Sequence, residues 1–147
     1  MSYDVPFFRI ITNQLERGFR SWTSCTSLTL PNSITTLAGE EMFSGWTAAT
    51  SLILPNSLTS ITGGSMFMNW TSLTELTLPA SLSGGYTFRG ASSLSLLRCL
   101  RTTPPTITSN AFYALPASCV IEVPASSLTA YQTAIYWSAL SSQMVGV

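Results

Sequence analysis

Phenylalanine recurs at nearly constant intervals along this chain of 147 residues. Successive intervals are 24, 24, 21 and 24 residues, between Phe19, Phe43, Phe67, Phe88 and Phe112. Nine residues after each of these comes an aliphatic residue: Leu28, Leu52, Leu76, Leu97 and Ile121. A constant period of this length is typical of repeat proteins, in which each repeat is one supersecondary unit. The chain is therefore predicted to form a solenoid of about five coils of 21–24 residues.

Each coil contains a short alternating pattern. In the stretch SLTLPNSIT, Leu28 and Leu30 alternate with small polar residues, which predicts a short strand with one buried face. Pro31 cannot donate a ladder hydrogen bond, so the strand is expected to end there. The same order returns in SLILPNSLT and in ELTLPASLS. One strand, one turn and one helical turn cannot bury these apolar residues alone, so neighbouring coils are expected to stack.

These repeats resemble the leucine-rich repeats of the BspA type. The segment TTPPTITSNAFYALPASCVIEVPASSLTAYQTAIYWSAL is similar to the closing part of such arrays, and the resemblance runs from about Leu15 to Leu140. It implies a leucine-rich-repeat solenoid of the α/β type, made mostly of short parallel strands and turns, with a C-terminal capping helix. It also implies a surface protein, since members of the family occur on the surfaces of anaerobic bacteria and some protozoa.

Three regions are predicted: an N-terminal arm or capping strand (1–15), the repeat solenoid (16–124), and a capping helix with a tail (125–147). The first region, with the apolar stretch VPFFRIITNQL, lies outside the repeat register. It is interpreted either as a cap over the first coil or as an arm that adds a strand to another subunit. The residues of this assembly arm would be Pro6, Phe7 and Phe8.

The last region is expected to cover the exposed end of the final coil. Ser126 or Ser127 is predicted to cap the N-terminus of a helix. The apolar side of this helix would consist of Leu128, Tyr131, Ile135 and Trp137.

Low charge limits the classes of partner. Charged residues make up 8% of the chain, against roughly 25% in a typical domain. The formal net charge is zero and no basic block exists, so we expect no nucleic-acid partner. No stretch approaches about 18 consecutive apolar residues, and membrane insertion is not expected. The N-terminus lacks the basic and apolar segments of a secretory signal peptide.

Residues that commonly carry catalysis are scarce. The chain has no histidine, which excludes Ser-His and Cys-His pairs and histidine zinc sites. Glu40 and Glu41 are sequence neighbours that point in different directions, and a solvated turn is expected there. Cys25, Cys99 and Cys119 have no metal-ligand spacing and are expected to be buried as small apolar residues. The sequence predicts no enzymatic activity, no cofactor and no metal.

What remains as a site is the outer face of the predicted sheet. On each strand, the residue between two buried aliphatics points outward, and repeat proteins often bind partners on such a face. Its side chains change from hydroxyls in the first coils to apolar and charged groups in the last. We hypothesise a partner-binding face, with its C-terminal half as the contact surface; the alternative is a merely soluble face. Its residues are Thr29, Ile53, Thr77, Leu96, Arg98, Val120 and Glu122.

The function expected from the sequence is a non-enzymatic protein-interaction or adhesion module on the outside of an assembly, binding a protein or a surface glycan. Because no export signal is seen, a phage decoration or fibre-associated protein is consistent with the sequence. Such a protein would be located on a virion or an extracellular surface. One alternative is a purely structural subunit, which forms a homo-oligomer or docks onto a larger assembly through residues 1–15. Another alternative function is a bacterial cell-surface adhesion repeat domain. The alternative location is the cytoplasm.

Overall fold

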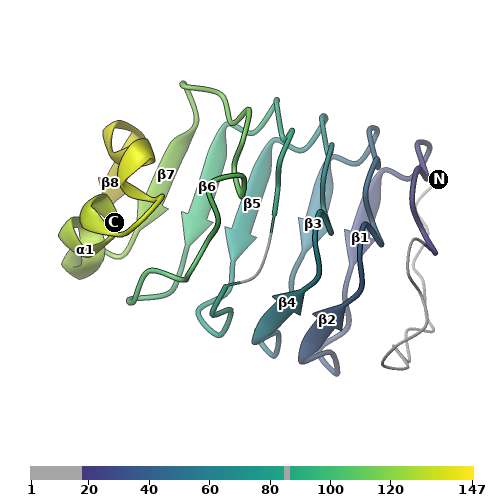
Figure 1. The fold of residues 1–147 in the computed structure, drawn as a ribbon, viewed down its shortest axis with the longest axis horizontal. Helices are drawn as coiled ribbons and strands as arrows, with labels where there is room; N and C mark the ends of the chain where they lie inside the picture. The colour runs from purple at the N-terminus through teal and green to yellow at the C-terminus, as the bar shows by residue number, and fades with distance from the viewer. Residues whose placement is uncertain (1–17, 85–86) are drawn as a thin grey trace.

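A computed structural model describes residues 18–84 and 87–147. Short parallel strands stand side by side along the long axis of the molecule (Figure 1). β1 pairs with β3, while β5, β6, β7 and β8 form a four-stranded sheet. The predicted short parallel strands are therefore present. Their bounds are β1 (Ser27–Thr29), β3 (Ser51–Ile53), β5 (Glu75–Leu78), β6 (Leu96–Cys99), β7 (Val120–Val123) and β8 (Met144–Gly146).

The strands pair in the register that the repeat predicts. Leu28 lies opposite Leu52, and Leu97 lies between Leu76 and Ile121. All five side chains are buried in one continuous core. Equivalent positions of successive coils therefore lie beside one another, as identical stacked units require.

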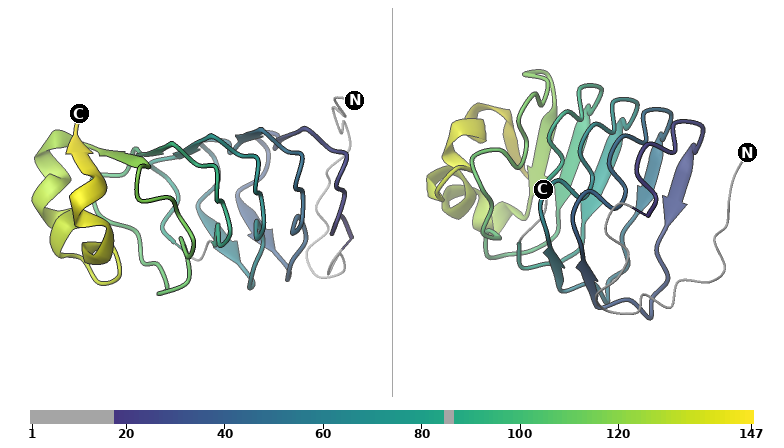
Figure 2. Two further views of the ribbon diagram at one scale, coloured as in Figure 1. Left: turned by 90° about the horizontal axis from the view of Figure 1, so that it is seen from above. Right: turned by 45° about the vertical axis from the view of Figure 1, so that its right-hand side comes forward.

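A second pair of strands, on another side of the coils, was not expected from the sequence (Figure 2). β2 (Thr36–Ala38) and β4 (Ser60–Thr62) are parallel, and their central residues Leu37 and Ile61 are fully buried. In the third coil the connecting segment is three residues shorter, and a single bridge between Gly84 and Thr106 continues the pairing. An alternation over only three residues cannot be told from a turn by pattern alone.

A column of aromatic rings joins all the coils. Each of the five phenylalanines at the repeat position stacks on the next, with ring centroids 5.1–6.3 Å apart and planes within 14° of parallel. The last one, Phe112, contacts Trp137 of the C-terminal segment at 5.5 Å. Each stacked pair contributes about 0.5–1.5 kcal/mol beyond its buried area. The column therefore holds the array together from the first coil to the last.

A second column consists of Trp22, Trp46 and Trp70. Their rings stack at 6.0 and 5.5 Å, within 9° of parallel. The indole N–H of Trp46 donates to Phe19 O at 2.6 Å, and that of Trp70 donates to Phe43 O at 2.7 Å. Each of these two indoles therefore binds the backbone of the preceding coil. Trp22 begins the column and is 41% exposed.

A left-handed backbone position recurs two residues after each phenylalanine. It is occupied by Ser21, Gly45, Asn69, Gly90 and Ala114, with φ between 61° and 82°. In the first four, the amide donates to a carbonyl of the next coil at 2.8 Å. Three of the five residues are not glycine, and this conformation costs them about 1–2 kcal/mol. At Ser21 and Asn69 the hydrogen bond between coils offsets that cost, so residue type alone does not mark the position.

The strand ladder is interrupted between β3 and β5. The two strands are neighbours, but in the described chain no ladder joins them, and β3 pairs with β1 alone. Elsewhere these two coils are bonded, because the amides of Phe43 and Gly45 donate to Met66 O and Met68 O at 3.2 and 2.8 Å. The aromatic turns, together with the amide of Ser83 that donates to Thr59 O at 2.9 Å, join the second coil to the third in place of the main sheet.

The C-terminal segment is not the single helix expected. It contains a 3₁₀ turn (Ala125–Ser127), α1 (Leu128–Thr133), a 3₁₀ segment (Ser138–Gln143) and then β8. Ala134 is extended, with ψ of 146°, and ends α1. The helical spacing assumed in the sequence therefore stops before Ile135, which is 70% exposed rather than part of the apolar side.

Of the other contacts expected for this segment, the structure contains the buried aromatic side chains but not the serine capping hydrogen bond. Tyr131 and Trp137 are fully buried, and the Trp137 indole N–H donates to Pro105 O at 2.8 Å. Leu128 packs against the core. Ser127 occupies the N-cap position, but its side chain makes no capping hydrogen bond. The segment lies at one end of the array, beyond β7 (Figure 1). The predicted arm, with Pro6, Phe7 and Phe8, lies outside the described residues.

Replacing Trp70 by Phe keeps an aromatic ring in the column but removes the donor to Phe43 O. Because Trp70 is fully buried, that carbonyl loses its partner away from water. We expect the free energy of unfolding to fall by about 1–3 kcal/mol, as measured by urea denaturation. The matched variant Trp22→Phe, at an exposed position, should change it by about 0.5 kcal/mol or less. Equal losses in the two variants would contradict the role assigned to the buried indole.

Hydrogen exchange should detect the interrupted ladder. β6 pairs on both sides with β5 and β7, whereas β3 pairs on one side. Local opening is easier where fewer hydrogen bonds must break, so the amides of β3 should exchange faster than those of β6. Exchange followed residue by residue by NMR checks this. Equal protection in the two strands would show that the interruption has no energetic consequence.

Candidate interaction surface

Side chains of the strands alternate between the core and the outer face, as predicted. On β1 and β3, Thr29 lies opposite Ile53, which is 54% exposed. Thr77, Arg98 and Glu122 lie side by side in one row across β5, β6 and β7. The Thr29–Ile53 pair and this row belong to different sheets, which are separated by the interruption between β3 and β5.

A second row runs beside the first on the same face. Leu96 of β6 lies between Glu75 of β5 and Val120 of β7. Val120 is 41% exposed, and Leu96 is half-buried. The four-stranded sheet therefore gathers five of the seven hypothesised residues onto one patch: Thr77, Leu96, Arg98, Val120 and Glu122.

Arg98 joins the two rows through ion pairs. Its Nε donates to Glu122 Oε2 at 2.9 Å, and its Nη1 donates to Glu75 Oε2 at 3.2 Å. The three side chains come from three adjacent strands, so the guanidinium bridges β5, β6 and β7. One cation faces two carboxylates, which leaves this cluster with a net charge of −1. Glu75 is the most accessible of the three, with 61% of its side chain exposed.

β8 extends the face beyond the residues that the sequence analysis selected. Val145 lies opposite Glu122 and is 43% exposed, while Met144 is buried. The alternation in MVGV is the only sequence signal of this strand. It was missed because those residues were assigned to a tail after the capping helix.

A hollow of about 170 Å³ adjoins the C-terminal ends of β6 and β7. Arg98 and Glu122 contribute to its lining, and with them Leu100, Pro124 and Val147 supply apolar surface. Leu100 is 49% exposed and Val147 70%. An apolar hollow thus opens beside the charged cluster, and the sequence analysis did not select its apolar residues.

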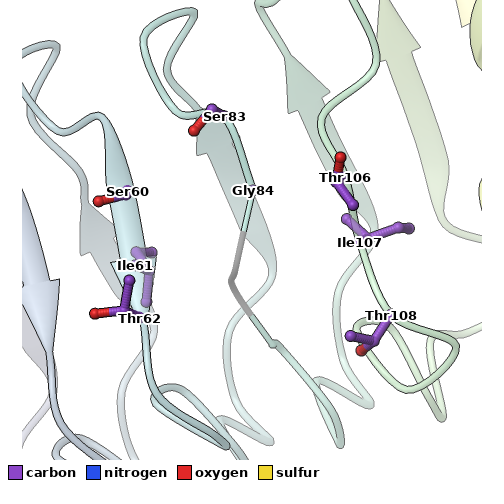
Figure 3. Close-up of a pocket in the computed structure, with 8 residues that line it drawn as sticks. All are labelled: Ser60, Ile61, Thr62, Ser83, Gly84, Thr106, Ile107 and Thr108. Carbon is purple, nitrogen blue, oxygen red and sulfur yellow. The ribbon is translucent and has the colours of Figure 1, made fainter.

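A larger hollow of about 370 Å³ lies on the side of the second strand pair (Figure 3). β4 borders it on one side and the segment from Thr106 to Thr108 on the other, while Ser83 and Gly84, in the coil that is three residues shorter, lie between them. Ser83 Oγ donates to Thr59 O at 3.0 Å, and Thr62 Oγ1 donates to Leu37 O at 3.4 Å. These two hydroxyls therefore bond to the preceding coil, and the described lining of this hollow carries no charged side chain, unlike the patch on the four-stranded sheet.

The strongly shifted ionisable groups lie in the core. Burial raises the pKa of the Cys119 thiol to about 11, and it also raises the pKa of the Cys99 thiol and of the Tyr131 phenol above their usual ranges. All three cysteines are free and buried, as predicted. Tyr131 donates its hydroxyl hydrogen to Arg101 O at 2.8 Å. These groups support the fold and do not reach the outer face.

Glu41 differs from its expected solvated position, because its Oε2 pairs with Arg20 Nη1 at 3.1 Å and its side chain is only 22% exposed.

Residues 18–84 and 87–147 contain no group of three or more His, Cys, Asp or Glu that could hold a metal ion. In the same residues, no helix has the length and apolar character needed to span a membrane.

Comparison with known families decides the class of repeat. The model of the BspA type leucine-rich repeat region (6 copies) matches residues 13–142, which is most of the chain. The chain belongs to this family. The resemblance read from the repeats is therefore confirmed, and a BspA-type leucine-rich repeat is typically an interaction or adhesion module. No curated protein matches the sequence.

The buried thiols and phenol make the stability of this BspA-type array sensitive to alkali. Folding raises their pKa values, so the folded chain keeps protons that the unfolded chain loses above about pH 9. Their contribution is fully present below pH 9, and for Cys119 it is lost as pH rises towards 11. We expect the free energy of unfolding to fall across this range, less steeply in Cys119→Ala. Urea denaturation at several pH values checks this, and identical slopes would contradict it.

Proposed function

We propose that this BspA-type repeat is a non-enzymatic protein-interaction module that contacts its partner through the outer face of β5–β8. The observation that carries the proposal is the patch on the four-stranded sheet, where exposed apolar residues surround the Arg98 ion pairs. Leu96, Val120 and Val145 provide the apolar part. Protein interfaces combine apolar surface with polar groups, and this patch has both, with the ion pairs inside a border of apolar side chains.

The other half of the face supports the proposal less well. Thr29 and Ile53 lie on the two-stranded sheet, across the interrupted ladder. Their neighbours Ser27 and Ser51 are polar and uncharged. We therefore place the contact on the C-terminal half, with Thr77 at its border.

A protein is a better match than a glycan for this patch. The rings of Phe43, Phe67, Trp46 and Trp70 stack in the core, and the patch itself presents aliphatic and charged side chains. Aliphatic groups and paired charges are typical of protein interfaces. A surface glycan stays an alternative outcome of the binding test below.

Display on the outside of an assembly is part of the same proposal. BspA-type repeats are generally cell-surface or extracellular, and the hydroxyl-rich, weakly charged composition suits an exposed adhesion module. A phage particle and a bacterial cell surface are the two assemblies that we propose. The structural alternative, self-association through residues 1–15, predicts an oligomer that is lost when this segment is removed, and light scattering separates the two.

The proposal is tested by selection of a displayed library of random linear peptides on the immobilised chain. Selected peptides should lose at least about tenfold in affinity for Val120→Asp, because a charge then replaces an exposed apolar residue of the patch. The control Ile135→Asp makes the same kind of change at a 70% exposed residue outside the patch and should bind normally. Binders indifferent to Val120→Asp, or binding by glycans alone on an array, would overturn the proposal.

A further inference from the structure

The hollow at the ends of β6 and β7 and the charged cluster are two parts of one surface, because Arg98 and Glu122 belong to both. We propose that this surface binds a protein segment in which an aliphatic side chain enters the hollow and a neighbouring lysine or arginine contacts Glu75 or Glu122. This inference rests on the proposed function and names the chemistry of the partner.

The apolar half of the inference comes from the lining of the hollow. Leu100, Pro124 and Val147 supply carbon surface, and Leu100 and Val147 remain largely exposed. A hollow of about 170 Å³ admits one aliphatic side chain. Interfaces are commonly anchored by a few side chains in such pockets, surrounded by contacts that exclude water. Burial of Leu100 and Val147 against an aliphatic partner would remove apolar surface from water, which favours association.

The inference that the partner carries a lysine or arginine comes from the net charge of the cluster. Arg98 contacts only Oε2 of Glu75 and Oε2 of Glu122, and in the described chain each Oε1 accepts no hydrogen bond. The nearest cation in sequence, Arg101, donates its Nη1 to Ala80 O at 3.0 Å and does not line the hollow. A partner carboxylate would add a third negative charge to the cluster, whereas a partner cation would neutralise it. Charge complementarity therefore selects a basic residue beside the aliphatic anchor.

Ion pairing explains why Arg98 itself does not serve as the binding cation. Although 41% of its side chain is exposed, two of its nitrogens already donate to carboxylates. It orients the two glutamates instead. The Glu122 carboxylate then lies beside the hollow, and that of Glu75 lies on the far side of Arg98, where a lysine or arginine next to the aliphatic anchor would contact one of them.

The same peptide selection tests this inference through the sequences recovered and through three variants. Peptides should share an aliphatic residue next to lysine or arginine. Leu100→Asp should weaken them by about tenfold or more, and Leu100→Ala by a smaller factor. Glu75→Gln should weaken them by up to about fivefold and reduce the effect of added salt, because an exposed ion pair contributes up to about 1 kcal/mol. Ile135→Asp is again the control for an added charge.

Several outcomes overturn the inference. Peptides lost in Val120→Asp but unaffected by Leu100→Asp and Leu100→Ala would leave the proposed function standing and remove the hollow from it. Acidic peptides, or peptides whose affinity does not depend on Glu75 or on salt, would remove the basic residue. A dimer that light scattering detects in the intact chain but not in Leu100→Ala would assign the hollow to a second copy. Thermal melts of each variant confirm that it is folded.

Discussion

Stacking of aromatic rings sets the spacing between coils, and the rest of the structure depends on that spacing. The phenylalanine column runs from Phe19 to Phe112 and ends on Trp137 in the C-terminal segment. Where the main sheet is interrupted between β3 and β5, the column and the turns around it still join the coils. The shortened third coil keeps its aromatic position as well. The array therefore tolerates defects in its strands because its rings stay in register.

The interaction surface is a consequence of that register. Arg98 can reach Glu75 and Glu122 because equivalent positions of three coils lie side by side on adjacent strands. The inward side chains vary between coils within what the core can pack, as where Cys99 lies opposite Leu78. Charged side chains of the strands lie on the outer face, where a partner can contact them.

Some features could be predicted from residues alone, and the reasons for success and failure are physical. The strands around Leu28, Leu52 and Leu76 were predicted because period-2 alternation is repeated at a constant interval. β2, β4 and β8 were missed because each gains its stability from pairing with a neighbouring segment, which a local pattern does not record. The left-handed positions at Ser21 and Asn69 were missed because a hydrogen bond between coils, not glycine, makes them acceptable.

The sequence by itself determined the repeat class, the core face of each strand and the family, because period and alternation record how identical units pack. Only the tertiary structure decided which outward residues form one surface. It separated Ile53 from the patch at an interrupted ladder and added Val145 through β8. It also brought Leu100 and Val147 together around a hollow. These outcomes depend on contacts between residues more than 20 positions apart, for which a local pattern carries no signal.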